Sequence, residues 1–230
     1  MQRVNTPYLC AAIILVCISH GKTVRADGLS GAYIGASVGR ERNSYDTAFV
    51  DDIYEHAATE VGDELKFTAR SVNRLDTMWW VYTGYMFTPN VGLDAGFMHL
   101  GELTYLASAN LEAGSATKPA AINATLSSHG PALSLLLRLP LTERWDVNMR
   151  LGDYYGKSQL VTGLNFNSKF TASPESSSGS SLLVTAGTAY GFAGHWTVRV
   201  DYLRVNQAGN GSTTGKYDVN AVAAGITFIF

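Results

Sequence analysis

The stretch Trp196-Thr-Val-Arg-Val-Asp-Tyr202 decides the fold class, because its apolar and polar residues alternate one by one. Successive side chains of a β-strand point to opposite faces, so a period of two predicts a strand with one apolar and one polar face. The apolar face carries Trp196, Val198, Val200 and Tyr202, and the polar face carries Thr197, Arg199 and Asp201. The charges on the polar face require either water or partners of opposite charge.

Seven further segments show the same alternation. It is clear in residues 91–100, 131–139 and 145–151. It is weaker in residues 32–40, 77–87, 181–192 and 217–230, and the last of these has apolar residues on both faces. The chain therefore predicts an all-β fold of about eight strands.

The connections between these strands alternate in length. The short ones are residues 88–90, 141–144 and 193–195, and the long, polar ones are roughly residues 41–74, 104–126, 157–179 and 206–215. Short turns at one end and long loops at the other are typical of an outer-membrane barrel. We therefore expect an eight-stranded antiparallel transmembrane β-barrel with short periplasmic turns, long extracellular loops and both termini periplasmic. A soluble β-sandwich or lipocalin-type barrel is the main alternative, since it also alternates and is also exported.

The placement of aromatic residues favours the membrane barrel. Amphipathic rings gather where hydrocarbon meets headgroups, so a membrane barrel carries two aromatic girdles on its outer face. The group expected beside the short turns comprises Tyr85, Phe87, Trp145, Tyr190, Phe192, Trp196, Phe228 and Phe230, and the group toward the long loops comprises Trp79, Phe97, Tyr155 and Tyr202. Such girdles have no purpose in a water-soluble barrel.

The inward faces predict a filled lumen. Small residues recur there, and the interior of eight strands is only wide enough for its own side chains. The charged residues on these faces are Asp94, Arg138, Asp146, Arg150, Arg199 and Asp201. Because buried charges need partners, we expect these three acids and three bases to form an internal ion-pair network. A balanced plug is favoured over a conducting channel.

The N-terminal region predicts export. Arg3 precedes an apolar run over residues 8–18 that is too short to span a bilayer as a helix, and Val24-Arg25-Ala26 is a small-residue cleavage pattern. We expect a signal peptide over residues 1–26 and a barrel domain over residues 27–230. A lipoprotein signal at Cys17 is disfavoured because Val16 stands where a small residue is wanted. Both cysteines, Cys10 and Cys17, would leave with the signal, so the exported chain would have no thiol.

Several segments resemble the OmpA-like and opacity-type families of eight-stranded barrels. Gly31-Ala-Tyr-Ile-Gly-Ala-Ser-Val-Gly39 is similar to their first strand, and Thr83-Gly-Tyr-Met-Phe-Thr-Pro-Asn-Val-Gly-Leu-Asp-Ala-Gly-Phe97 to the hairpin of the second and third. The chain closes in Ala224-Gly-Ile-Thr-Phe-Ile-Phe230. The resemblance implies that Phe228 and Phe230 belong to a signal read by the barrel-assembly machinery. It does not extend to the soluble peptidoglycan-binding domain of OmpA, so we do not carry over cell-wall anchoring.

An enzymatic alternative rests on His129. Some small outer-membrane barrels modify lipids with a His-Ser arrangement, and His129 follows Ser127 and Ser128 near a long-loop end. The lipid A deacylase pattern wants Ser and Asn after the histidine, whereas Gly130 and Pro131 follow here. We therefore expect no catalytic site. Lipid modification and a narrow solute pore stay open as alternatives.

The remaining chemistry points to a surface or structural protein. No histidine spacing suggests a metal site, and no motif suggests a cofactor. The acidic stretch from Asp46 to Glu64 fits a solvated loop better than a calcium loop. Removal of residues 1–26 would lower the net charge from −2 to about −5, which argues against nucleic acid. We expect a monomer that contacts outer-membrane lipids and lipopolysaccharide, with loops that serve envelope integrity or bind a host or environmental ligand.

Overall fold

The computed structural model describes residues 31–60, 63–113, 116–166, 169–211 and 213–230. The expected signal peptide, residues 1–26, lies outside the described residues. The strands are β1 (Gly31–Asn43), β2 (Glu64–Asn73), β3 (Leu75–Met86), β4 (Val91–Ala113), β5 (Ala116–Pro140), β6 (Trp145–Phe166), β7 (Lys169–Ala193), β8 (Trp196–Asn210) and β9 (Gly215–Ile229). One helix, α2 (Ala48–Glu60), lies between β1 and β2.

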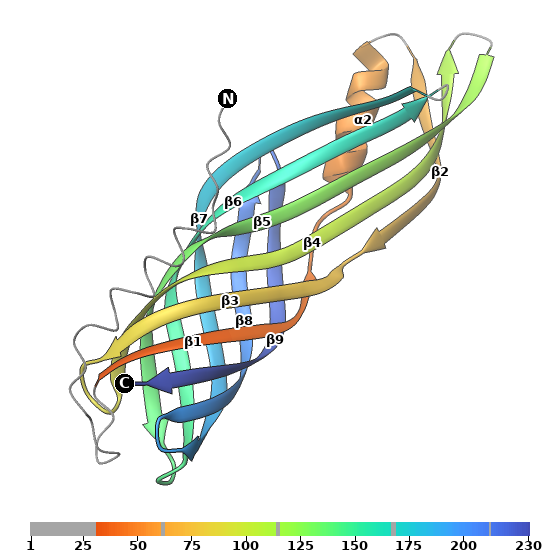
Figure 1. The fold of residues 1–230 in the computed structure, drawn as a ribbon. Coiled ribbons are helices and arrows are strands. Elements are labelled where there is room, and N and C mark those ends of the chain that lie inside the picture. The colour runs from red at the N-terminus through yellow and green to blue at the C-terminus, as the bar shows by residue number, and fades with distance from the viewer. Residues whose placement is uncertain (1–30, 61–62, 114–115, 167–168, 212) are drawn as a thin grey trace.

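Eight of these strands close into a ring (Figure 1). Their order is β4-β3-β1-β9-β8-β7-β6-β5, and β5 pairs back to β4. All neighbours in the ring are antiparallel. Strands β2 and β3 both pair with β4, one after the other along its length. Strand β3 pairs with residues 92–99 of β4, and β2 pairs with residues 104–112. The expected eight-stranded antiparallel barrel is confirmed.

The outer face of the ring is apolar and exposed. Large apolar side chains such as Val81, Leu135 and Val200 point outward and are 40%, 41% and 51% exposed. A water-soluble protein rarely exposes a continuous apolar surface of this kind. The band fits the hydrocarbon layer of a membrane, which strands can cross only in a closed barrel. No helix among the described residues is long and apolar enough to cross a bilayer.

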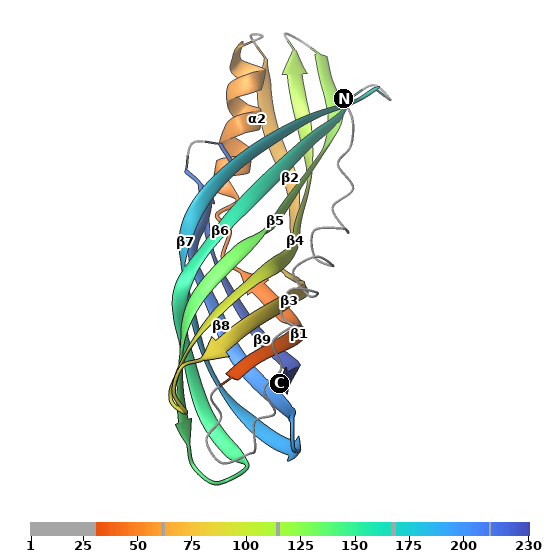
Figure 2. The ribbon, with the colours of Figure 1, turned by 60° about the vertical axis from the view of Figure 1, so that its left-hand side comes forward.

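The long connections are built mostly from strand and helix. Of the predicted loops, residues 104–126 form the upper parts of β4 and β5, and residues 157–179 form those of β6 and β7, apart from residues 114–115 and 167–168. With β2, these strands continue beyond the ring as a curved open sheet, which we call the extension (Figures 1 and 2). The sequence indicates these strands only weakly. Tyr105, Ala107 and Ala109 are buried while the residues between them face outward. Because the outer face of the extension is polar, the segment has too few apolar residues to be recognised as strand from its hydrophobicity.

Helix α2 packs against the inner face of the extension. At its start, the Asp46 carboxylate accepts a hydrogen bond from Ala48 N at 3.0 Å. Its inward face buries Val50, Tyr54 and Ala58. The acidic segment is therefore a docked helix, and our expectation of a solvated loop was wrong for residues 48–60. The spacing of Val50, Tyr54 and Ala58, four residues apart, is a helical signal that the surrounding acids obscure.

Candidate functional site

The centre of the barrel holds a buried ion pair between β4 and β6. The Arg150 guanidinium donates through Nε to Asp94 Oδ2, and both side chains are fully buried. The same guanidinium lies 5.1 Å from the ring of Trp80 and 5.2 Å from that of Tyr82. The positive charge is thus held by a carboxylate and by two aromatic faces, which attract cations through their quadrupoles.

A second pair lies beside the first. Arg199 on β8 donates to both oxygens of Asp201, at 2.6 and 2.7 Å. It also donates to Asn148 Oδ1 at 2.8 Å and to the Tyr82 hydroxyl at 3.3 Å. Asp201 Oδ1 lies 4.0 Å from Arg150 Nη1, which links the two pairs. Residues two apart on one strand lie on the same face, so the alternation alone places Arg199 and Asp201 next to each other.

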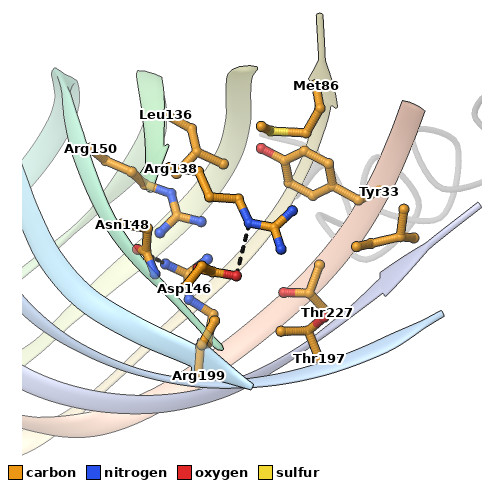
Figure 3. Close-up of a pocket in the computed structure, with 12 residues that line it drawn as sticks. Tyr33, Met86, Leu136, Arg138, Asp146, Asn148, Arg150, Thr197, Arg199 and Thr227 are labelled. Carbon is orange, nitrogen blue, oxygen red and sulfur yellow. Dashed lines mark hydrogen bonds and ion pairs between the residues drawn. The ribbon is translucent and has the colours of Figure 1, made fainter. Parts of the chain in front are cut away.

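A third pair lines a small cavity toward the short-turn end. Arg138 Nε donates to Asp146 Oδ2 at 2.8 Å, across the hairpin of β5 and β6. This pair faces Tyr33 and Thr227 across a small cavity (Figure 3). The volume of the cavity is about 50 Å³. A space of this size admits a few water molecules. The structure therefore brings the six predicted charges together in three pairs inside the barrel.

We expect Tyr82→Phe to weaken this network without changing its charge. The Tyr82 hydroxyl accepts a hydrogen bond from Arg199 and lies 2.8 Å from Thr227 Oγ1. Its removal should lower the free energy of unfolding by about 1–3 kcal/mol. Urea unfolding in lipid vesicles measures the change. Tyr85→Phe is the matched control, because Tyr85 lies on the same strand, faces outward and is 50% exposed. Equal effects of the two variants would contradict the role of the hydroxyl.

Beyond the network, the lumen is filled by apolar side chains. The fully buried residues here include Met78, Met98, Leu183 and Leu203. The tight fit extends to the backbone, since a Cβ at Gly35 would overlap the Tyr82 ring. The interior of the barrel thus has a charged layer and an apolar layer stacked along its axis. Side chains fill both layers.

The predicted girdle residues lie on the outer face. Those at least 40% exposed are Trp79, Tyr85, Phe87, Trp145, Tyr155, Phe192, Trp196 and Tyr202. Tyr190 and Phe228 are half-buried because they contact the rings of Trp145 and Trp196, with centroids 4.9 Å apart in each pair. At the chain end, Phe230 N donates to Ala32 O at 3.0 Å, and the Phe230 ring packs edge-on against Phe228.

His129 faces outward and the serine beside it faces inward. Its ring lies 6.1 Å from Phe97 and 6.5 Å from His99, within the outer aromatic surface. Ser128 is 1% exposed and hydrogen-bonds Tyr154 and Ser158 inside the barrel. The strand alternation therefore separates these two side chains. Among the described residues, no cluster of three or more His, Cys, Asp or Glu side chains forms a metal site.

Helix α2 is fastened to the extension by polar contacts. Tyr105 donates to Asp51 Oδ1 at 2.5 Å, and Arg70 Nε lies 3.0 Å from Asp51 Oδ2. Tyr54 donates to the backbone carbonyls of Asn123 and Gly163, at 3.3 and 3.0 Å. Burial raises the pKa of Tyr54 to about 12, so it stays a neutral donor at physiological pH. These contacts join the helix to β2, β4, β5 and β6.

Our sequence reasoning missed several residues of the interior. Trp80 and Tyr82 were read only as parts of a weak strand, although their inward register follows from the outward position of Trp79. Asn148 was assigned inward but not to the network. Glu41 was placed in a loop, whereas it lies on β1 with an inward, buried side chain. Continuing the alternation of β1 by two residues past Gly39 would have found it.

The comparisons with known proteins agree on the fold family. The model of the OmpA-like transmembrane domain matches residues 30–230. Outer membrane protein A of Serratia marcescens is 23% identical over 150 residues, covering 65% of this chain and 38% of that protein. The corresponding protein of Yersinia pseudotuberculosis is 24% identical with the same coverage. The chain thus spans well under half the length of these relatives.

Solved structures show weaker likeness. The attachment invasion locus protein Ail of Yersinia pestis, in complex with the heparin analogue sucrose octasulfate, has a TM-score of 0.45 at 12% identity and covers 87% of this chain and 99% of its own. Outer membrane protein OprG of Pseudomonas aeruginosa has a TM-score of 0.43 at 14% identity, covering 90% and 99%. The family match spans almost all of the described barrel. The chain therefore belongs to the OmpA-like transmembrane domain family and is an outer-membrane β-barrel.

Proposed function

We propose that this protein presents a stiff interaction surface on the outside of the cell. The observation that carries the proposal is the extension, in which α2 shares a core with β2, β4, β5 and β6 beyond the apolar band. Ordered surfaces lose less conformational entropy on binding than free loops do, so such a structure suits recognition. The partner would be a host or environmental ligand, or another component of the envelope.

The proposed orientation places the extension outside and the short turns in the periplasm. This fits the general asymmetry of outer-membrane barrels. Residues 1–26 would act as the secretory signal, and the strand ending in Phe228 and Phe230 would contact the assembly machinery. The two aromatic girdles would mark the membrane boundaries, with lipopolysaccharide around the upper one.

Single cysteines test the orientation. Ser176→Cys lies on the exposed part of β7 in the extension, and Glu143→Cys lies in a short turn. With a membrane-impermeant maleimide, intact cells should label Ser176→Cys and leave Glu143→Cys unlabelled until the outer membrane is permeabilised. The unaltered chain controls for background labelling. The reverse labelling pattern would overturn the proposed orientation.

A shortened variant tests the role of the extension. Val161 pairs with Pro174 in the β6–β7 hairpin, so a two-residue Asn-Gly turn can replace residues 161–174. Cells lacking the gene should lose adhesion, serum survival or envelope integrity. The full chain should restore the lost property, whereas the shortened barrel should assemble without restoring it. Full restoration by the shortened barrel would show that the β6–β7 part of the extension is not needed for that property.

The geometry gives less support to a pore or a lipid-modifying enzyme. The lumen is filled by ion pairs and apolar side chains, so we expect no large, steady openings in planar-bilayer recordings. Ser128 lies on the opposite face of β5 from His129, so the two do not form a nucleophile-base pair. Ser127 shares the outward face with His129, but no hydrogen bond joins these two described residues. If the protein is not a lipid-modifying enzyme, its expression should leave the acylation of lipid A and phospholipids unchanged. Mass spectrometry of extracted lipids measures this.

A further inference from the structure

Glu41 is a buried carboxylate without a partner. Its side chain is 1% exposed, and neither Oε1 nor Oε2 has a hydrogen-bond partner among the described residues. Two residues further along the inward face of β1, Asn43 is 4% exposed and its Oδ1 also has no partner. Three oxygen atoms therefore lie in the interior without the donors that buried acceptors ordinarily have.

A second carboxylate stands opposite the first. Asp76 on β3 is the direct cross-strand partner of Glu41 in the register. Side chains in such positions have Cβ atoms about 4.5–5.5 Å apart, and like charges there are destabilising. Asp76 Oδ2 accepts from Glu102 N at 2.7 Å. Among the described residues, no Lys, Arg or His lies within ion-pair distance of either carboxylate.

Strand β4 has a β-bulge beside Glu41 and Asp76. Residues 100 and 101 stand against the single Ser128 of β5, which makes a β-bulge. Gly101 has a φ of +75°, and a Cβ there would lie 2.9 Å from Glu41 Oε1 and 3.1 Å from Asp76 Cβ. The Glu41 carboxylate therefore points toward the bulge. A bulge also leaves one residue outside the strand ladder, where backbone oxygens are not committed to a neighbour.

We propose that Glu41, Asp76 and Asn43 bind a hard divalent cation, Ca²⁺ or Mg²⁺, between β1, β3 and the β4 bulge. Carboxylate and amide oxygens are the ligands that these ions prefer, and a charge of +2 would balance the two carboxylates. The site lies beyond Trp79 on β3, toward the extension, and Asp76 is half-buried. Sequence reasoning expected no metal because it searched for a histidine spacing and a calcium-loop pattern, and it did not consider Glu41.

Burial supports the need for a counter-charge. Glu41 is 1% exposed and faces Asp76 across the strand pair. A buried carboxylate is costly unless a positive charge is nearby. A bound cation would supply it and would join the start of the extension to the barrel wall. Because this site lies inside the wall, it does not depend on the proposed surface role.

Direct cation binding tests the proposal. The full chain is refolded into zwitterionic detergent without lipopolysaccharide, treated with EDTA, dialysed and titrated with Ca²⁺ and with Mg²⁺. We expect about one ion per chain, with a dissociation constant on the order of 10⁻⁴ M, since few protein oxygens are available. Glu41→Gln and Asp76→Asn should each weaken binding by at least about tenfold, because affinity follows the ligand charge.

The control separates this site from the acidic helix. Glu55→Gln removes an exposed carboxylate of α2 and should leave binding unchanged. Heat-dependent gel migration checks that each variant is folded, and Asp76→Asn serves if Glu41→Gln does not fold. Absence of binding to the unaltered chain would overturn the proposal, and so would binding that Glu55→Gln abolishes while Asp76→Asn retains it. Neither result would bear on the cysteine-labelling test of orientation.

Discussion

Replacement of Arg150 by methionine should cost the barrel about 3–5 kcal/mol of unfolding free energy, because it leaves Asp94 buried without its charge partner. Arg150 and Asp94 are both fully buried, so water cannot replace the lost interaction. The substitution also removes the cation from the faces of Trp80 and Tyr82. Urea unfolding in lipid vesicles, followed by tryptophan fluorescence, measures the change.

Two further variants show whether the uncompensated charge is the cause. Asp94→Leu added to Arg150→Met removes both charges and should recover part of the lost stability, since apolar replacement of a whole buried pair is often tolerated. Arg204→Met is the surface control, because Arg204 pairs with Asp218 on the exposed outer face and such pairs contribute about 0–1 kcal/mol. If Arg150→Met were no more harmful than Arg204→Met, the central ion pair would not stabilise the barrel.

Val50→Asp should detach α2 from the extension. The Val50 side chain is fully buried against the inner face, and a carboxylate there would lie among apolar side chains. We expect a local loss of at least about 3 kcal/mol, which exceeds what the contacts of Tyr54 and Asp51 would supply. Limited proteolysis should then cut within residues 44–63, at sites that the unaltered protein protects.

The transmembrane ring should survive this change. Its strands are paired independently of α2, so the heat-dependent gel shift should persist in Val50→Asp. His56→Asp places the same carboxylate on the exposed side of the helix and should leave the cleavage pattern unchanged. Equal cleavage of both variants would show that any added charge frees the helix, and cleavage of neither would show that Val50 does not anchor it.

The transmembrane part of the fold could be predicted from the sequence because the membrane imposes a simple pattern. Lipid outside and a narrow lumen inside require the two faces of a strand to differ strongly in polarity. The alternation in residues 145–151 and 196–202 therefore predicts directly which side chains face the lipid and which face the lumen. The same alternation placed Arg150, Arg199 and Asp201 in the lumen. The pairing of Arg150 with Asp94 could not be predicted, because it depends on the stagger between strands around the ring.

The extension was harder to predict because water replaces lipid on its outer face. Thr104, Ser108 and Thr125 are ordinary residues for a solvated strand face, yet they lower the apolar content that identified the other strands. Helix α2 was hidden for a similar reason, since its acids dominate a segment whose apolar residues recur every three to four positions rather than every second one. Glu41 was missed because β1 continues past Arg40, where the outward face becomes charged while the inward face stays buried.

Hydrogen exchange of the full chain in lipid vesicles, resolved by mass spectrometry, tests the central claim that the extension is ordered rather than a set of free loops. The account predicts that amides of residues 104–113, 117–126 and 157–164 exchange orders of magnitude more slowly than those of an unstructured peptide, because strand pairing protects them. Residues 48–60 should be protected to a lesser degree. Exchange of all these segments at the rate of an unstructured peptide, with the membrane strands still protected, would contradict the account and remove the proposed interaction surface.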